Sequence, residues 1–412
     1  MHSFKLLLKV LARRKFFTLV NLFGISFTLM VLLVGTTLFE NFLFPRGPEK
    51  RSDLMLVAQR LEMTNDDNTT TWTSDAGYYF LDRFVRPMKT PHKFAIMGNA
   101  TTVMNYQSGA KVELAMRPAD GNIWDILDYQ FLAGGPFSEA QNQAAAQVAI
   151  VSRGTAETVF GTDQVLGKSL EINGLVYEVI GVVQNVSRLE SRAYGEVWVP
   201  INSLKDQSFK DKIVDDFLGF FLAEKASDLP LIKDEYDEVI KNVVFPDPSF
   251  TVLRGGADNK IEMMARSVFG GYEKETQAGQ LLGVILGLVL LFMTLPAINL
   301  MNLNTSRIME RSSEIGVRKA FGATTWDLMK QLLRENLLLT TLGGLVGLLL
   351  AVLVLSLIAS SQIFPYFEWH LNFRVFLAGF FLVCVFGLYS GLYPAFNMSR
   401  LEVVSSLKRR AL

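Results

Sequence analysis

Hydrophobic residues along this chain are concentrated in four long runs, separated by stretches in which polar and charged residues are frequent. The runs cover residues 16–39, 281–301, 337–358 and 375–396. Each has roughly the 20 apolar residues that a helix needs to cross a bilayer. None carries Asp, Glu, Lys or Arg in its middle, which disfavours an ion pump or secondary transporter, because those proteins place charges inside the bilayer. The pattern predicts four transmembrane helices.

The first run could instead be a secretory signal peptide. The apolar part of a signal peptide is shorter, about 7–15 residues, and ends at a small-residue cleavage site. The run 16–39 is longer and continues into Glu40-Asn41-Phe42-Leu43-Phe44-Pro45, where no such site is present. We therefore interpret it as an uncleaved transmembrane helix.

The long segment 40–260 has no run that could span a membrane, and its short patterns are those of strands and helices. Strands are predicted at 170–172 and 176–183, because Asn173-Gly174 between them is a strong hairpin signal. Apolar residues at helical spacing predict a helix over 229–243. We expect a soluble domain of mixed α and β structure.

A stalk helix is predicted over residues 261–280, between this domain and the second apolar run. The segment has a helical composition and no proline, although Gly270-Gly271 could loosen it. A helix continuing from solvent into the membrane would rise by about 1.5 Å per residue.

Basic residues predict the orientation of the four helices, because Lys and Arg are enriched on the cytoplasmic side. They cluster in residues 1–15, 302–336 and 397–412, whereas the short loop 359–374 has a single basic residue, Arg374. Both termini and the loop 302–336 are therefore expected in the cytoplasm. The domain at 40–260 and the short loop are expected outside it.

The loop between the second and third runs contains an amphipathic stretch at 307–336. The Glu314/Arg318 pair has the i,i+4 order that supports a helix. Gly322 suits a left-handed residue ending that helix. Thr324 and Asp327 resemble a capping box that starts another helix.

This stretch could be a solvated linker, but a linker would not expose two apolar faces. The faces consist of Ile315, Val317 and Phe321 and of Trp326, Leu328 and Met329. They could rest on the bilayer as an interfacial helix or dock into a groove on a partner, and the pattern favours neither.

Catalytic chemistry has no support in the sequence. Gly161 to Ser169 resembles a phosphate-binding loop ending in Gly-Lys-Ser, but it has five residues between its glycines, where the motif has four. We interpret it as a turn between a helix and a strand. One cysteine, three scattered histidines and zero net charge favour neither a metal site nor nucleic-acid binding. We expect no enzyme activity in this chain.

The residues also resemble a known family. The sequence Glu-Ile-Gly-Val-Arg-Lys-Ala-Phe-Gly-Ala-Thr at 314–324 is similar to the signature of the MacB/FtsX-like ABC transporter permeases. Further similarities follow in order along nearly the whole chain: residues 14–24, Phe131–Gly135, Phe160-Gly161, Leu166–Lys168, Val179–Val183, Glu310-Arg311, Gln331 and Glu335-Asn336.

The resemblance implies an α+β membrane protein of four transmembrane helices, with a large MacB-like domain inserted between the first and second. Such permeases work as dimers, of identical or different chains, with two cytoplasmic ATPase subunits. No ATPase is fused to this chain, so we expect a separate one. That partner would bind ATP and Mg²⁺, and we expect no cofactor or metal here.

The resemblance also implies where the ATPase docks, which favours the partner groove over the bilayer surface. The coupling region would consist of Glu314, Ile315, Gly316, Val317, Arg318, Lys319, Ala320, Phe321, Gly322 and Ala323.

Two functions are compatible with this resemblance. The first is export or extraction of a peptide, drug, lipid or lipoprotein by ATP-driven motion transmitted to the outer domain, with a periplasmic adaptor and outer-membrane channel as further partners. The second is FtsX-like control of a cell-wall hydrolase or a sensor kinase. Either implies a bacterial inner-membrane protein, and the large outer domain favours transport.

Overall fold

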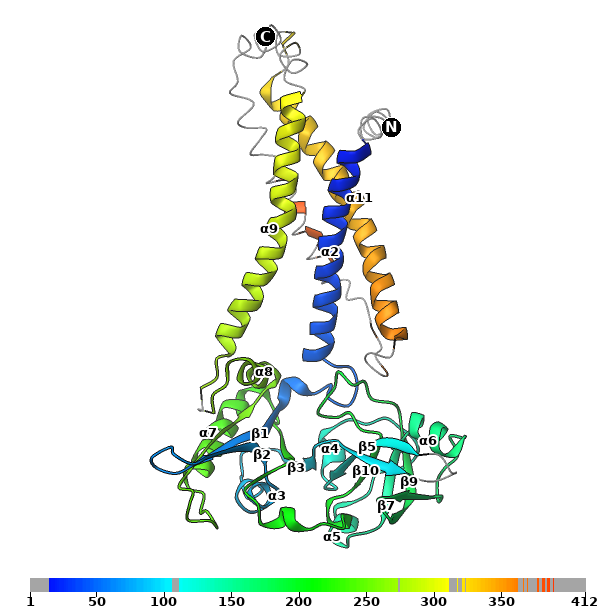
Figure 1. Cartoon of the computed structure of the whole chain (residues 1–412), viewed down its shortest axis with the longest axis vertical. Coiled ribbons are helices and arrows are strands. Elements are labelled where there is room, and N and C mark those ends of the chain that lie inside the picture. The colour runs from blue at the N-terminus through cyan, green and yellow to red at the C-terminus, as the bar shows by residue number, and fades with distance from the viewer. Residues whose placement is uncertain are drawn as a thin grey trace. The chain divides into compact units, whose positions relative to one another are not determined.

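The computed structural model describes residues 15–105, 111–272, 275–310 and 324–361, with isolated positions at 317, 321–322, 366, 369, 376–377, 380–381, 384–385 and 388. The chain forms two compact units. The helical unit combines residues 1–39, 282–363 and 369–412, and the outer unit combines residues 40–281 and 364–368. Figure 1 shows their elements.

Three long helices supply most of the described helical unit: α2 (Lys15–Leu43), α9 (Ala278–Glu310) and α11 (Thr325–Ser360). Ile25 and Leu29 of α2 are buried in a cluster with Ala351 of α11. Helices α2 and α11 approach closely because α11 has glycines on the face that packs against α2. A Cβ at Gly343 would lie 2.7 Å from Ile25 Cγ2, and one at Gly347 would lie 2.8 Å from the Ser26 carbonyl oxygen. Small residues four apart are typical of helix contacts in membranes.

Two described helical segments are long and apolar enough to cross a membrane, Thr18–Leu43 and Leu337–Ser360. They coincide with the first and third predicted runs. The second run lies in α9, of which Ala278–Phe292 is apolar but shorter. Most of the fourth run, 375–396, lies outside the described residues. Four transmembrane helices therefore remain a prediction.

The outer unit is built on one mixed sheet, to which thirteen strands contribute among the described residues. Its order is β11-β2-β1-β12-β3-β5-β10-β7-β9-β6, with β13 paired to β1, β4 to β5 and β8 to β9. The strands are β1 (Met55–Thr64), β2 (Thr71–Ala76), β3 (Lys93–Gly98), β4 (Thr101–Asn105), β5 (Val112–Ala119), β6 (Phe131–Gly134), β7 (Val148–Ser152), β8 (Ser169–Ile172), β9 (Leu175–Val183), β10 (Val197–Pro200), β11 (Val214–Asp215), β12 (Phe217–Leu222) and β13 (Val252–Asp258).

The helices of this unit are short: α3 (Tyr78–Phe80), α4 (Ile123–Ile126), α5 (Glu139–Gln143), α6 (Arg153–Phe160), α7 (Leu229–Lys241) and α8 (Lys260–Phe269). Helix α7 packs its apolar face, including Ile232, Tyr236 and Ile240, into the core over β1, β12 and β13. A separate core under α6 contains Ala156, Val159 and the inward residues of β7 to β10. The predicted mixed α and β domain is confirmed.

Local predictions in this unit also hold. Strands β8 and β9 form a hairpin in which Ile172 pairs with Leu175, and the two loop residues, Asn173 and Gly174, have φ of 51° and 79°. Positive φ at both positions is typical of the type I′ turn. The glycine-rich stretch from Gly161 is a turn between α6 and β8, as expected.

The predicted stalk helix over 261–280 is wrong as one continuous element. Helix α8 ends at Phe269, and α9 begins at Ala278. Gly270 and Gly271 have φ of 76° and 91°, a region that residues with a side chain rarely adopt. The two glycines therefore end the helix instead of only loosening it.

Candidate functional site

The predicted coupling region is described at three of its ten positions: Val317, Phe321 and Gly322. The other seven, Glu314, Ile315, Gly316, Arg318, Lys319, Ala320 and Ala323, lie outside the described residues. The Phe321 N–H donates to the Val317 carbonyl at 3.1 Å, and Gly322 follows with the expected left-handed conformation, φ 91°. Phe321 is 88% exposed. An ATPase contact at this turn remains a prediction.

A group of buried charges surrounds the start of α8 in the outer unit, and we call it the α8 network. Charged side chains are rarely buried unless they are paired. These six are at most 7% exposed: Glu49, Glu190, Arg192, Asp258, Lys260 and Arg266. Three are acids and three are bases.

Lys260, the first residue of α8, connects this helix to the end of α2. Its Nζ lies 2.6 Å from Glu49 Oε2 and donates to the Phe42 carbonyl at 2.9 Å. The ammonium also lies 5.6 Å from the centre of the Phe42 ring, within the range of a cation–π contact. Phe42 is the penultimate residue of α2. One side chain therefore joins α8 to the segment that enters the outer unit.

A second carboxyl group, Glu190, lies directly beside Glu49. The Glu49 N–H donates to Glu190 Oε2 at 3.2 Å. Burial, assisted by the negative charge of Glu49, raises the pKa of Glu190 to about 7. Gly47 faces the same carboxyl group, and a Cβ there would overlap it. The chain leaving α2 is therefore packed tightly against the acidic side of the network.

The loop that carries Glu190 and Arg192 is anchored to the sheet. Arg117 of β5 donates to the carbonyls of Ser191 and Tyr194, and Tyr129 Oη donates to the Ala193 carbonyl at 2.7 Å. Burial lowers the pKa of the Arg117 guanidinium. Because Arg117 ties this loop to β5, Glu190 and Arg192 form a wall beside α8.

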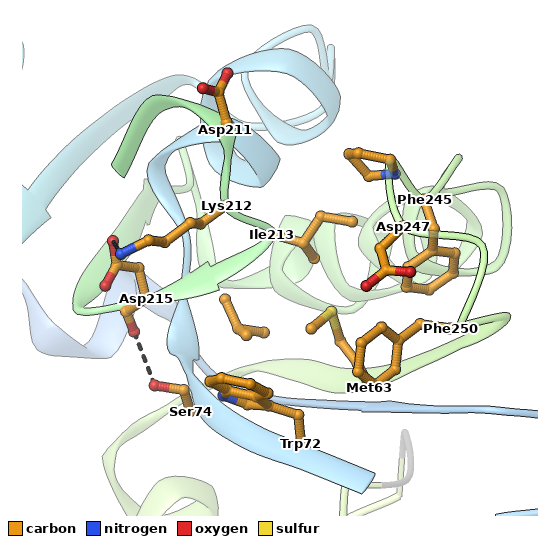
Figure 2. Close-up of a pocket in the computed structure, with 12 residues that line it drawn as sticks. Met63, Trp72, Ser74, Asp211, Lys212, Ile213, Asp215, Phe245, Asp247 and Phe250 are labelled. Atoms are coloured by element: carbon orange, nitrogen blue, oxygen red, sulfur yellow. Dashed lines mark hydrogen bonds and ion pairs between the residues drawn. The ribbon is translucent and has the colours of Figure 1, made fainter. Parts of the chain in front are cut away.

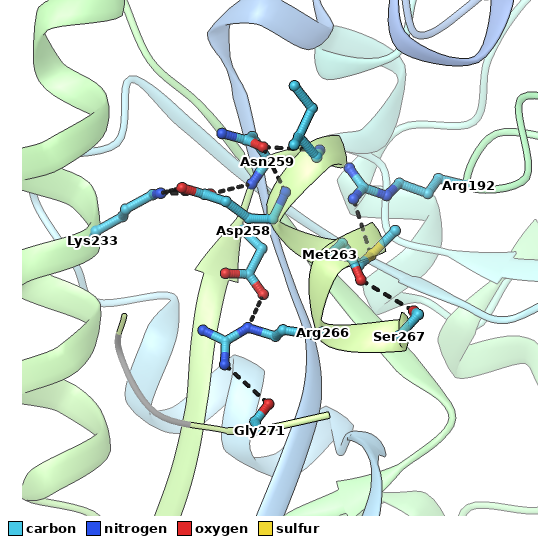
Figure 3. A network of polar contacts seen from close by, with 10 residues as sticks. Arg192, Lys233, Asp258, Asn259, Met263, Arg266, Ser267 and Gly271 are labelled. Carbon is cyan, nitrogen blue, oxygen red and sulfur yellow. Dashed lines mark hydrogen bonds and ion pairs between the residues drawn. The ribbon is translucent and has the colours of Figure 1, made fainter. Parts of the chain in front are cut away.

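The Arg192 guanidinium reaches from this wall to α8, where Nη2 lies 3.0 Å from Met263 Sδ (Figure 3). Its Nε is buried without a hydrogen-bond partner among the described residues. A thioether is a weak acceptor, so this contact leaves Arg192 only partly satisfied.

Arg266 connects α8 to the residues that follow it. It forms a buried ion pair with Asp258 at the end of β13, and its Nη1 donates to the Gly271 carbonyl at 3.2 Å (Figure 3). Burial raises the pKa of Asp258, and the hydrogen bond from Arg266 opposes that effect. Gly271 is the second residue of the break between α8 and α9. Arg266 therefore connects the break between α8 and α9 to Asp258 at the end of β13.

The start of α8 is itself capped. Asn259 accepts hydrogen bonds from the N–H groups of Ile261 and Glu262, and Glu262 accepts in return from the Asn259 N–H, which completes a capping box. Lys233 of α7 pairs with Glu262. The helix is thus fixed at its first turn by its own cap, by α7 and by Lys260.

Two family models match the chain in order. The model of the MacB-like periplasmic core domain matches residues 18–238, more than half of the chain, and the model of the FtsX-like permease C-terminal region matches residues 284–403. The chain belongs to the MacB/FtsX-like permeases. Helix α8 and the glycine break lie between the two matched regions.

Individual relatives agree with the family. The permease is 29% identical over 278 residues to the uncharacterized ABC transporter permease YknZ of Bacillus subtilis (strain 168), covering 67% of this chain and 65% of YknZ. It is 25% identical over 307 residues to the macrolide export ATP-binding/permease protein MacB of Pasteurella multocida (strain Pm70), covering 71% of this chain and 44% of MacB. The solved extracellular domain of a YknZ from Gram-positive bacteria matches 45% of this chain at 17% identity and a TM-score of 0.36.

Sequence reasoning did not find the α8 network of this permease. Acids in polar stretches, such as Asp66/Asp67 and Asp215/Asp216, are expected on the solvated surface; Asp66, Asp67 and Asp216 are exposed, and Asp215 is half-buried. Glu49 and Glu190 have similar local contexts but are buried. One signal was available, because the Asn259 to Glu262 spacing is that of a capping box and marks where α8 begins.

Proposed function

We propose that this chain is the permease subunit of an ABC transporter that transmits ATP-driven motion of a separate cytoplasmic ATPase to its outer domain. Membership of the MacB/FtsX-like permeases supports this proposal. The helices transmit movement, and no cargo needs to pass between them. The outer domain responds by exporting or extracting an amphiphilic molecule.

The α8 network is the observation that carries the proposal. Lys260 binds the carbonyl of Phe42 at the end of α2, and Arg266 binds the carbonyl of Gly271, seven residues before α9 begins. Displacement of either long helix along its axis would therefore pull on α8. Since α8 is clamped to β13, α7 and the 190–194 loop, that pull reaches the sheet.

Stability alone is a weak reason to keep such a network. Replacing buried ion pairs by apolar residues is often neutral or stabilising. The α8 network is also incompletely satisfied, because Arg192 Nε and Arg266 Nη2 lack partners among the described residues. These charges are better explained if they stabilise α8 in two alternative arrangements, because transmission requires an element with two states.

At the other end of the mechanism, Glu314 to Ala323 is the proposed ATPase contact, and the structure describes Val317, Phe321 and Gly322 of it. Val317 is 47% exposed and Phe321 is 88% exposed, and Gly322 follows with a positive φ. An exposed phenylalanine beside a glycine turn is suited to insertion into a hydrophobic groove on a partner.

The cargo class is proposed from the relatives. Their names describe macrolide export and pyoverdine export. Peptides, drugs, lipids and lipoproteins remain the classes to test. FtsX-like control of a hydrolase or kinase is less favoured, because the match to the MacB-like periplasmic core domain covers more than half of the chain.

The test is recovery of an ATPase from the native host. The full chain is solubilised in detergent after cross-linking and captured in three forms: wild type, Phe321→Glu and Val244→Glu. Val244 is a matched control, since it is 72% exposed and lies in the outer unit.

We expect an ABC ATPase with the wild type and with Val244→Glu, and its loss with Phe321→Glu. Absence of an ATPase from the wild-type capture would refute the transporter proposal. Equal recovery from all three forms would refute the contact at Phe321.

A further inference from the structure

A cavity of about 400 Å³ opens on the outer unit beside the last residues of β1 and the first residues of β2. Met63 and Trp72 pair across these strands, so their side chains share one face and form the floor. Phe245 and Phe250, from the segment between α7 and β13, form a wall beside them (Figure 2). Trp72 remains 60% exposed, so the protein itself leaves this aromatic surface open.

A carboxylate lies over this apolar surface. Figure 2 shows Asp247 between the Phe245 ring and Ile213, with its carboxylate directed toward the cavity. The Ser249 N–H donates to Asp247 Oδ1 at 2.8 Å. This hydrogen bond lowers the pKa of Asp247 and so favours the ionised carboxylate.

The opposite rim adds further negative charge. Lys212 lies 3.4 Å from Asp215 and offsets its charge. Asp211 stands next to this pair. The lining therefore contains three aspartates and one lysine, a formal charge of −2. An anion would be repelled here, and a neutral molecule would leave the carboxylate of Asp247 without a cationic partner.

We propose that this cavity binds a small organic cation, with an ammonium group at Asp247 and a compact apolar body against Met63, Trp72 and Phe250. The volume falls in the range of small-molecule sites, about 300–1,000 Å³. Trp72 also offers a ring face, the best aromatic partner for a cation. Binding here does not require the ATPase, so its test can fail without bearing on the proposed function.

The test uses the full chain in lipid nanodiscs and three probes of similar size: phenylbutylammonium, phenylbutanol and phenylbutanoate. Binding is followed by tryptophan fluorescence, with empty nanodiscs to correct for partition into lipid. The Trp72→Phe variant identifies the signal, because four other tryptophans contribute to the emission. We expect a saturable change with the ammonium probe that is absent from Trp72→Phe.

Asp247 is tested with Asp247→Asn, Asp247→Lys and the control Asp163→Asn, which removes an exposed acid near β8. Loss of one surface charge pair should weaken ammonium binding by about two- to fivefold in Asp247→Asn. Charge reversal in Asp247→Lys should make phenylbutanoate bind better than phenylbutylammonium. Asp163→Asn should bind like the wild type.

Three results would overturn the proposal. They are equal binding of the ammonium and alcohol probes, an unchanged fluorescence response in Trp72→Phe, and Asp247 variants that bind like Asp163→Asn.

Discussion

The Lys260–Glu49 pair gives the sharpest test of the α8 network. In Lys260→Met the apolar stem is kept, but the ammonium is lost and Glu49, only 1% exposed, becomes a buried charge without its ion pair. The Ala193 N–H still donates to Glu49 at 3.1 Å, which compensates in part. Removing one partner of a buried pair typically costs about 3–5 kcal/mol. We expect a loss near the lower end of that range.

The assay is thermal unfolding of the full chain in nanodiscs, followed by tryptophan fluorescence. For a unit of this size, 1 kcal/mol shifts Tm by about 2–4 °C, so Lys260→Met should lower Tm by about 6–12 °C. Lys241→Met is the matched control, because Lys241 also forms ion pairs, with Asp237 and Glu238, but is exposed. Its Tm should change little.

A double variant separates the two consequences of losing Lys260. Glu49→Gln removes the orphaned charge, so Lys260→Met with Glu49→Gln should recover most of the lost stability. The bond from Lys260 to the Phe42 carbonyl stays broken, so ATP-driven movement of the outer domain should remain impaired in the reconstituted complex. A Tm loss no larger than that of Lys241→Met, or a double variant no more stable than the single one, would refute this account.

Two further predictions concern burial and close packing. Folding raises the pKa of Glu190 from 4.5 to about 7. The stability that this shift contributes is fully present below pH 4.5 and is lost as the pH rises through 7. The Tm measured from pH 5 to 8 should therefore fall more steeply in the wild type than in Glu190→Gln. Gly347→Val should separate α2 from α11 and lower the resistance of the helical unit to denaturing detergent, because the new Cβ would lie 2.8 Å from the Ser26 carbonyl oxygen. Gly287→Val, in α9 with open space around it, should have a small effect, and equal losses from both would contradict the packing argument.

Much of this architecture was predictable because its signals are local. Apolar runs identified two helical segments of membrane-spanning length, and Asn173-Gly174 identified the β8–β9 hairpin. The predicted helix 229–243 is observed at Leu229–Lys241. In each case the deciding residues are neighbours in sequence, so periodicity or turn chemistry is sufficient.

The α8 network was not predictable in this way. Glu49 and Glu190 are 141 residues apart, and Lys260 reaches a carbonyl 218 residues before it. A charged residue in a polar stretch has the same local pattern whether it is exposed or buried. Its burial depends on how β1 pairs with β12 and β13, which the local sequence does not specify. The floor of the cavity likewise depends on the register that places Met63 opposite Trp72.

The glycine break after α8 gives a final prediction about transmission. Gly270 and Gly271 have positive φ and open space around them, so alanine at both positions would strain the backbone without a clash, at about 1–3 kcal/mol per residue. Alanine also favours helix more than any other residue, so Gly270→Ala/Gly271→Ala should extend α8. Hydrogen exchange should then show new protection at 270–272.

An extended α8 would move the Gly271 carbonyl away from Arg266, and we expect ATP-driven movement of the outer domain to decrease. Gly161→Ala/Gly167→Ala is a matched control, because these glycines also have positive φ and open space but lie far from α8 in sequence. If both double variants impair movement equally, the effect is general strain. If movement persists although 270–272 becomes protected, the break is not needed for transmission, and the pull on α8 must pass through Lys260 alone.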